Sequence, residues 1–264
     1  MSDRISSLVP NKSLGQHWLE DASTLEAICQ AAELTPDDTV LEIGPGLGAL
    51  TKHLVIAASK VVAVEIDPRL TQLLPNRITA ANLKIVEADI LEFDLTQLPS
   101  GYKVVANLPY YLSNQLLRRL SETTNPPRLA AILLQKEVAE RVVAQPGRMS
   151  LLSVTTQFFW QAELGITVPA VLFTPPPKVD ATLLILRRRK HVLFPDVDKS
   201  TFFRLVRAGF NQRRKTLINS ISAGLHYPKS DIEKACQSAG IDPMRRAQTL
   251  TLVEWHKLYK SLTG

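Results

Sequence analysis

Short apolar runs alternate with amphipathic segments between residues 21 and 188. The apolar runs are typical of buried strands and lie at residues 39–43, 60–65, 84–88, 103–107, 129–134, 161–168 and 181–188. Apolar residues at helical spacing predict helices at residues 21–33, 49–57, 68–74, 113–122, 136–144 and 148–158. This alternation predicts an α/β fold with a seven-stranded parallel sheet and helices on both of its faces.

The pattern changes after residue 190. The segment Leu193-Phe194-Pro195-Asp196 is typical of a linker. Later residues have helical spacing throughout, at 199–210, 213–222, 229–238 and 251–261. We therefore expect an α/β domain over residues 1–190 and a smaller all-helical domain over residues 196–264.

Composition narrows the class of protein. The chain of 264 residues is 45% hydrophobic, enough for a sizeable core, yet it has no long apolar run, so we expect no membrane span. Cys29 and Cys236 lie far apart and are expected to be free thiols in a reducing compartment, which favours the cytoplasm. The histidines show no metal-ligand spacing. We expect a cytoplasmic monomer without a metal site.

Charge is distributed unevenly along the chain. The net charge is +6, but residues 187–264 hold 16 Lys and Arg against 6 Asp and Glu, whereas residues 1–186 are net acidic. A basic helical domain beside a mildly acidic α/β domain favours a nucleic-acid partner over a merely well-solvated surface. We predict that Arg213, Arg214 and Lys215, at the start of an expected helix, bind RNA.

A glycine-rich turn joins the first expected strand to the next helix. In Gly44-Pro45-Gly46-Leu47-Gly48 the glycines permit positive φ and close approach of a ligand to the backbone, so Gly44 and Gly46 are candidate cofactor-binding residues. The helix that begins there directs free N–H groups at a ligand. Glu65 ends the next apolar run, at the position of a ribose-hydroxyl acceptor in nucleotide folds. The alternative is a tight turn in some other α/β protein.

Asp89 follows the third expected strand and is predicted to accept a hydrogen bond from the exocyclic amine of an adenine ring. For both acids, Glu65 and Asp89, a helix cap or a plain surface acid is the alternative. The glycine loop lacks the Gly-Lys-Ser/Thr of a phosphate cradle, and Pro45 removes an N–H donor. These features argue against pyrophosphate and favour a nucleoside with an amino-acid tail, as in S-adenosylmethionine.

The fourth expected strand ends in the candidate catalytic motif Asn107-Leu108-Pro109-Tyr110. The Asn107 side-chain oxygen and the Leu108 carbonyl are predicted to accept the two N6 protons of an adenine, which directs the nitrogen lone pair at a methyl donor. Pro109 fixes the turn, and the Tyr110 ring offers a face on which the base stacks. The base must leave its own stack to reach such a pocket, where positioning replaces a strong general base.

These motifs resemble the small-subunit ribosomal RNA adenine N6-dimethyltransferase family, the kasugamycin-sensitivity dimethylases. The resemblance covers nearly the whole chain. In chain order the matching segments are Lys12…Gly15-Gln16, Glu42-Ile43-Gly44-Pro45-Gly46, Val64-Glu65-Ile66-Asp67, Asn107-Leu108-Pro109-Tyr110, Gln135-Lys136-Glu137-Val138-Ala139, Phe173…Pro175…Pro177-Lys178-Val179-Asp180 and Phe210…Arg213-Arg214-Lys215-Thr216-Leu217.

The resemblance implies a Rossmann-like class I methyltransferase fold with S-adenosylmethionine as methyl donor. It also implies dimethylation of two adjacent adenosines near the 3′ end of small-subunit (16S) rRNA, on an immature 30S particle that the helical domain helps to dock. The implied cofactor contacts are His17, Leu19, Gly44, Glu65, Asp89 and Asn107, and Phe173 is implied to pack near the target base. The family usually has Asn-Phe where this chain has His17-Trp18, and we expect His17 to hydrogen-bond the cofactor instead.

Two other functions stay open on the sequence alone. A sister family dimethylates large-subunit rRNA, but the run from Phe210 to Leu217 and the Lys178-Val179-Asp180 loop favour the small-subunit family. The fold can also serve as a non-catalytic ribosome-assembly factor, and the intact Asn107 motif argues against loss of activity.

Overall fold

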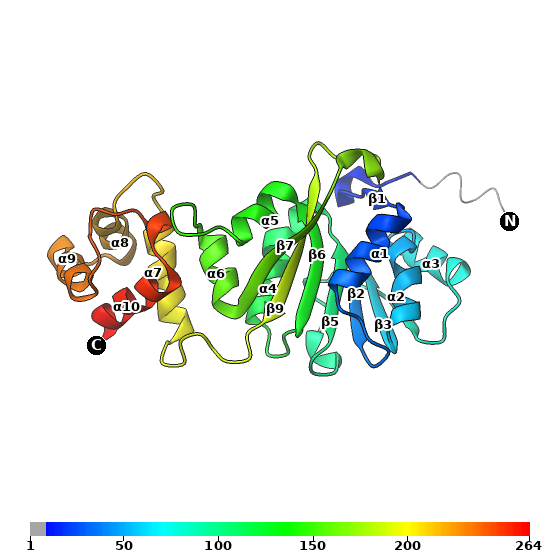
Figure 1. The fold of residues 1–264 in the computed structure, drawn as a ribbon, viewed down its shortest axis with the longest axis horizontal. Helices are drawn as coiled ribbons and strands as arrows, with labels where there is room; N and C mark the ends of the chain where they lie inside the picture. Colours follow the sequence, from blue (N-terminus) through cyan, green and yellow to red (C-terminus); the bar gives the residue numbers. More distant parts are fainter. Residues whose placement is uncertain (1–8) are drawn as a thin grey trace. The chain divides into compact units, whose positions relative to one another are not determined.

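A seven-stranded mixed sheet forms the centre of the first of two compact units (Figure 1). The computed structural model describes residues 9–264, of which residues 9–139 and 161–188 belong to this unit. The sheet strands are β2 (Thr39–Ile43), β3 (Lys60–Glu65), β4 (Leu83–Glu87), β5 (Lys103–Asn107), β6 (Leu129–Gln135), β7 (Trp160–Val168) and β9 (Ala181–Arg188). They lie in the order β4-β3-β2-β5-β6-β9-β7, and the neighbours from β4 to β6 pair in parallel.

The prediction of an all-parallel sheet is wrong at β9. This strand runs antiparallel to β6, with Leu129 opposite Arg187 and Gln135 opposite Ala181. The connection from β7 to β9 holds a 3-10 turn, η4 (Ala170–Leu172), and the two-residue strand β8 (Phe173–Thr174), but no α-helix. Because a parallel neighbour needs a longer crossover, a strand that returns without one runs antiparallel.

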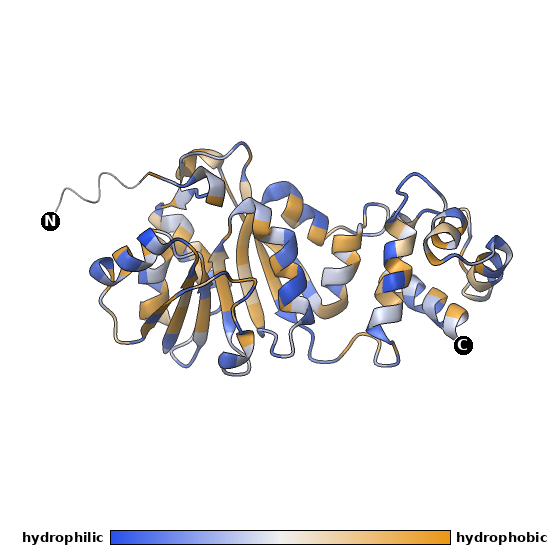
Figure 2. Cartoon of the chain, turned by 180° about the vertical axis from the view of Figure 1, so that it is seen from behind, coloured by the Kyte–Doolittle hydropathy of each residue, from blue (hydrophilic) through white to orange (hydrophobic). Residues whose placement is uncertain are grey.

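The central strands are buried on both faces. The chain of this unit also forms helices α1 (Ala22–Ala31), which precedes β2, and α2 (Ala49–Ala57), α3 (Pro68–Arg77), α4 (Ser113–Glu122) and α5 (Lys136–Val142), which follow β2, β3, β5 and β6 in turn. Consecutive residues of β2, β3, β5 and β6 are buried, and these strands are largely orange in Figure 2. Burial on both faces explains why they are continuous apolar runs in the sequence rather than alternating ones.

A short strap from the N-terminal region crosses this unit. After the 3-10 turn η1 (Lys12–Leu14), strand β1 (Trp18–Leu19) pairs antiparallel with β8, with Trp18 opposite Thr174 and Leu19 opposite Phe173. We call residues 14–19 the N-terminal strap. The sequence indicates only an irregular, polar segment over residues 1–20, of which residues 1–8 lie outside the described residues.

The second compact unit is helical and comprises residues 140–160 and 189–264. Its helices are α6 (Leu151–Phe159), α7 (Lys199–Phe210), α8 (Leu217–Leu225), α9 (Lys229–Ser238) and α10 (Leu252–Thr263). The expected boundary at residues 190–196 differs from this division, since α6 joins the later helices. The reason is an aromatic core, in which the Phe158 ring lies 5.2 Å from Phe202, 5.1 Å from Phe203 and 5.9 Å from Phe194 between centroids.

The start of α8 is later than the sequence pattern predicts. The helix begins at Leu217, and the exposed residues 211–215 form the turn that precedes it. Five consecutive exposed polar side chains offer no apolar face to bury, whereas Leu217 is fully buried. Arg213, Arg214 and Lys215 therefore lie in the α7–α8 turn and not on a helix.

Candidate active site

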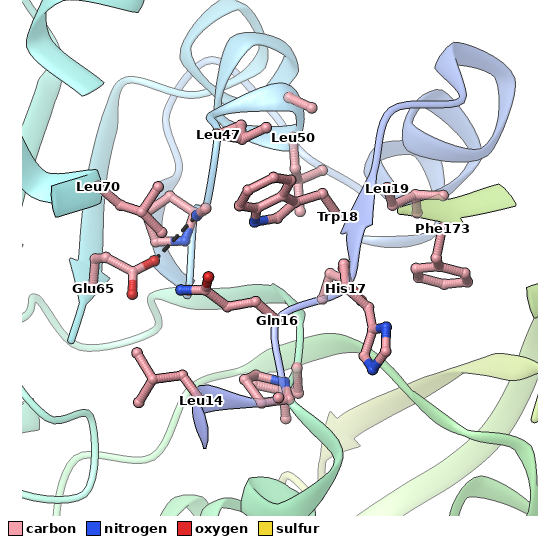
Figure 3. Close-up of a pocket in the computed structure, with 18 of the residues that line it drawn as sticks. Leu14, Gln16, His17, Trp18, Leu19, Leu47, Leu50, Glu65, Leu70 and Phe173 are labelled. Atoms are coloured by element: carbon pink, nitrogen blue, oxygen red, sulfur yellow. Dashed lines mark hydrogen bonds between the residues drawn. The ribbon is translucent and has the colours of Figure 1, made fainter. Parts of the chain in front are cut away.

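A pocket lies where the carboxyl ends of β2, β3 and β5 meet the N-terminal strap (Figure 3). Parallel strands place their carboxyl ends at one edge of a sheet, where ligands of such folds bind. Among the predicted site residues, the pocket brings together His17, Leu19, Gly44, Gly46, Glu65, Asn107, Leu108, Pro109, Tyr110 and Phe173. All of these belong to the first compact unit.

The glycine loop forms one wall of the pocket. Gly44 donates its N–H to the Val64 carbonyl at 2.9 Å and has a φ of +67°, and a Cβ placed there would meet no atom within 4 Å. That open side is where a ligand can approach the backbone. Gly48 has a φ of +83°, and a Cβ there would lie 2.6 Å from the Ile78 Cδ1 atom. Gly44 thus leaves the pocket open to a ligand, and Gly48 lets the loop pack against α3.

Glu65 ends β3 and points its carboxylate into the pocket (Figure 3). One oxygen accepts the N–H groups of Ile66 at 2.9 Å and Asp67 at 3.0 Å, and the other accepts the Gly46 N–H at 3.2 Å. Burial raises the pKa of Glu65, while these backbone donors oppose the shift. The carboxylate is therefore fixed in place by the backbone, with lone pairs left to accept hydroxyl groups of a ligand.

Glu42 is a pocket residue that the sequence pattern alone did not indicate. It is 1% exposed, and neither of its carboxylate oxygens has a hydrogen-bond partner among residues 9–264. Burial raises its pKa to about 8, an effect that the nearby Thr51 hydroxyl offsets only in part. An acidic residue inside an otherwise apolar strand, two positions before the first glycine, is the signal that marks it in the sequence. A buried unpaired carboxylate fits a cationic ligand group.

Asn107 is oriented by the N-terminal strap. It ends β5, and its side-chain Nδ2 donates to the backbone carbonyl of His17 at 3.2 Å. Since a carbonyl only accepts, this bond assigns the amide nitrogen to the strap and presents Oδ1 as the acceptor. The next residue, Leu108, donates its N–H to the Leu133 carbonyl at 3.2 Å, so the motif is continuous with the sheet.

Aromatic rings form the opposite side of the pocket. Tyr110 begins the 3-10 turn η3 (Tyr110–Leu112), and its hydroxyl donates to the Val179 carbonyl at 3.4 Å. Burial raises the pKa of Tyr110 to about 12, so the ring stays neutral. Phe173 is 3% exposed and comes from β8. The His17 side chain lies on the Phe173 side and points away from Glu65 (Figure 3).

The strap also reaches the glycine loop. A Cβ on Gly46 would lie 3.3 Å from the Trp18 Cδ1 atom, so the indole packs directly on the loop. Trp18 Nε1 is buried without a hydrogen-bond partner in the described part of the chain. Gln16 donates to the Asp67 carboxylate at 2.9 Å, which ties the strap to the start of α3. The strap thus contacts the glycine loop, the start of α3 and Asn107 at the end of β5.

Two predicted groups lie elsewhere. Asp89 is not among the described residues that line this pocket, and its Oδ1 accepts the Leu91 N–H at 2.8 Å. Arg213, Arg214 and Lys215 are exposed in the second unit.

Within residues 9–264 there is no group of three or more His, Cys, Asp and Glu side chains that could hold a metal ion. No helix in the same residues is both long and apolar enough to cross a membrane.

The fold and the pocket together define an α/β methyltransferase. In the sheet, β9 runs antiparallel to β6, a glycine loop follows the first sheet strand, and an acid ends the next one. Comparison with known proteins gives the family. The family model described as "Ribosomal RNA adenine dimethylase" matches residues 9–264. The chain belongs to this ribosomal RNA adenine dimethylase family.

Relatives and solved structures agree with that assignment. The chain is 41% identical over 256 residues to the ribosomal RNA small subunit methyltransferase A of Dehalococcoides mccartyi strain 195, covering 96% of this chain and 88% of that protein. It is also 41% identical to the protein of the same name from Moorella thermoacetica, covering 98% and 94%. A dimethyladenosine transferase from Plasmodium falciparum superposes with a TM-score of 0.77 at 26% identity, covering 92% and 96%. The 23S rRNA methyltransferase ErmE superposes with a TM-score of 0.75 at 29% identity, covering 94% and 100%.

Proposed function

We propose that this protein transfers methyl groups from S-adenosylmethionine to N6 of two adjacent adenosines near the 3′ end of small-subunit rRNA. The observation that carries the proposal is the fixed Asn107 amide, whose nitrogen is held by the His17 carbonyl and whose oxygen is left as an acceptor in the pocket. The N6 amine of adenine is a hydrogen-bond donor, so an acceptor oxygen in a fixed orientation can hold it in place.

The pocket residues fit S-adenosylmethionine. Glu42, which is buried and has no hydrogen-bond partner among residues 9–264, suits the ammonium or sulfonium of this cofactor when its side chain is ionised, and Glu65 suits ribose hydroxyls. His17, Leu19, Gly44, Gly46 and Asn107 line the same space. When bound, the cofactor supplies an electrophilic methyl group. Asp89 would join the adenine contacts through its carboxylate, which has further lone pairs besides the one that accepts the Leu91 N–H.

The chain itself supplies position and electrostatics. Asn107 Oδ1 and the Leu108 carbonyl accept hydrogen bonds from the N6 amine of the target base, and Tyr110 and Phe173 hold its ring. The Asn107 oxygen carries no charge, so it accepts a hydrogen bond from N6 without forming an ion pair with a cationic methyl donor. Pro109 is the N-cap residue directly before η3, so its fixed backbone sets where Tyr110 enters the pocket lining.

The second unit is proposed to bind RNA through the α7–α8 turn. Arg213, Arg214 and Lys215 are consecutive, exposed and basic, as phosphate-binding residues are. The partner we propose is an immature 30S particle, on which this unit helps to dock. We further propose that the protein acts as a monomer in the cytoplasm. The free cysteines Cys29 and Cys236 support a reducing compartment.

Methyl incorporation from labelled S-adenosylmethionine tests the substrate. The full-length protein is incubated with small-subunit particles that lack the modification and, separately, with large-subunit RNA. Label in dimethyladenosine of the small-subunit rRNA is the expected result. The structural similarity to the 23S rRNA methyltransferase ErmE makes large-subunit RNA the second candidate, and label in that RNA alone would establish it instead.

A further inference from the structure

Two side chains of the pocket have buried polar atoms that nothing in the described part of the chain pairs with. The Trp18 Nε1–H group is a hydrogen-bond donor, and the Glu42 carboxylate oxygens are acceptors. Since the two groups do not bond to each other, each is left to bond another molecule. A buried polar atom without a partner costs free energy, which a ligand of the right chemistry removes. The pocket therefore fits a ligand that carries both an acceptor and a cationic donor.

The Trp18 indole lies against the glycine loop and inside the pocket. A Cβ on Gly46 would lie 3.3 Å from Trp18 Cδ1 and 3.6 Å from Trp18 Nε1, so the nitrogen edge of the ring faces this part of the loop. Figure 3 shows the ring between Glu65 and His17, among the residues that line the pocket. The pairing of Trp18 with Thr174 of β8 fixes the backbone from which the ring extends. The indole N–H therefore belongs to the pocket wall.

The pocket is acidic, so an anionic ligand group needs a hydrogen-bond donor there. The acids that line the pocket are Glu20, Glu42 and Glu65. Within residues 9–264 no Lys or Arg side chain lines it. In the glycine loop, the N–H groups of Gly44 and Gly46 already donate within the protein, and Pro45 has none. The Trp18 N–H, by contrast, is an uncharged donor that is still free to bond an anionic group.

From these observations we infer that Trp18 is a cofactor-positioning residue, whose indole N–H donates to the carboxylate of the amino-acid tail of S-adenosylmethionine. Glu42 in its ionised form matches the ammonium of the same tail, so the two unpartnered groups recognise its two opposite charges. The inference rests on the cofactor of the proposed function. It goes beyond that function, because it assigns a side chain of the N-terminal strap to one chemical group of the cofactor.

The test combines one substitution with one change of ligand, measured by calorimetry on the full-length protein. Trp18→Phe keeps an aromatic ring on Gly46 and loses the N–H. The ligands are S-adenosylhomocysteine and its decarboxylated analogue, which keeps the adenosine and the amine. Because the smaller ring affects both ligands alike, the ratio of the two losses of affinity measures the bond between the N–H and the carboxylate. Thermal unfolding of both proteins controls for the fold.

Trp18→Phe should weaken binding of S-adenosylhomocysteine by roughly tenfold to 100-fold, the loss expected for one hydrogen bond to a charged group. Affinity for the decarboxylated analogue should change far less, since that ligand has no carboxylate to lose. A ratio of the two losses of about threefold or more supports the bond, and a smaller ratio overturns the inference.

A second measurement uses the wild-type protein and so does not depend on how the variant folds. In a nitrogen–proton correlation spectrum the three tryptophans of the chain give separate indole signals. Trp160 and Trp255 are fully buried in the second unit and do not line the pocket, so the signal that responds to ligand is that of Trp18.

A hydrogen bond to a carboxylate moves the indole proton signal downfield. We expect this shift with S-adenosylhomocysteine and not with its decarboxylated analogue. The same shift with both ligands, or with neither, would overturn the inference. If the wild-type protein did not bind S-adenosylhomocysteine at all, the cofactor of the proposed function would be refuted instead.

Discussion

The side-chain amide of Asn107 donates a hydrogen bond to the backbone carbonyl of His17, a residue 90 positions earlier in the chain. The bond joins the end of a central strand to the N-terminal strap. It explains how an uncharged side chain is held with its oxygen toward the pocket. The Asn107 acceptor is thus positioned by backbone geometry outside its own motif, and substitutions at this residue test the chemistry directly.

Asn107→Ala should lower the single-turnover rate of methyl transfer by roughly 100- to 1000-fold, the usual loss when one oriented hydrogen bond to a transition state is removed. Cofactor affinity should change much less than the rate. Rapid-quench assays on small-subunit particles measure the rate, and thermal unfolding controls for the fold. Asn107→Asp is the matched variant, because it keeps an acceptor and the shape but loses the donor to the His17 carbonyl. We expect it to retain part of the activity. A near-normal rate in the Ala variant would show that the chemistry does not depend on this motif.

Glu65→Ala should weaken S-adenosylmethionine binding. Each lost hydrogen bond to a charged acceptor costs roughly 1.5–3 kcal/mol. The structure adds a second effect, since the N–H groups of Gly46, Ile66 and Asp67 lose their acceptor. Glu65→Gln is therefore the better-matched change, as it keeps one acceptor oxygen for these donors. Calorimetry measures the affinity and urea unfolding the stability. Unchanged affinity in both variants would refute the ribose assignment.

Glu42 should make stability and cofactor binding depend on pH. Its pKa rises from an ordinary 4.5 to about 8 in the folded protein, so the protonated form stabilises the fold. This contribution is complete below pH 4.5 and is lost as the pH rises through 8. Relative to Glu42→Gln, the unfolding free energy of the wild-type protein should fall by up to about 1.4 kcal/mol per pH unit in that window. Urea unfolding at pH 5, 6, 7 and 8 measures it.

The same carboxylate should favour a cationic ligand only when it is ionised. Affinity of the wild-type protein for S-adenosylmethionine should therefore rise between about pH 6 and 8, and the Glu42→Gln variant should show a flatter profile. The difference between the two profiles removes the ligand's own titration. Identical profiles would mean that Glu42 does not contact a charged group of the cofactor.

Neutralising Arg213, Arg214 and Lys215 together should weaken RNA binding and flatten its salt dependence. The slope should fall by about 0.7–0.9 for each phosphate that the variant no longer neutralises. The control variant neutralises Lys229, Lys234 and Lys257, three exposed lysines elsewhere in the same unit, and so makes the same change in net charge. Filter binding over a salt series measures the slope. Equal effects of the two variants would point to net charge and not to this turn.

The parts of the fold with strong local patterns could be predicted from the sequence. Strands such as β2, β5 and β9 begin and end where the apolar runs do, because burial on both faces leaves a continuous apolar signal. The glycine loop and Glu65 could be placed for the same reason, since they follow directly on such strands. Leu217 marks the start of α8 only after burial is known, because the polar residues 211–215 before it could equally form the exposed first turn of a helix.

Features that depend on distant partners could not be predicted. Strand β1 has two residues, too few for any periodicity, and its partner β8 is a similarly short strand more than 150 positions later in the chain. The His17 ring contacts Pro175, 158 positions later, so no local pattern indicates its direction. The role of Glu42 in the pocket could not be predicted, because its apolar neighbours Leu41 and Ile43 make it part of a buried-strand pattern. Its lack of a partner among the described residues is visible only in three dimensions.

The two-residue pairing of β1 with β8 has a consequence for turnover. In β1, Trp18 packs against the glycine loop, and Leu19 pairs with Phe173 of β8, which lies on the aromatic side of the pocket. We expect release of the spent cofactor to open the β1–β8 pairing, which would also loosen Phe173 against the base. Under the proposed function, each adenosine receives its two methyl groups in separate rounds, with an exchange of cofactor between them. We therefore expect monomethylated adenosine to escape as a detectable intermediate whenever fresh cofactor is scarce.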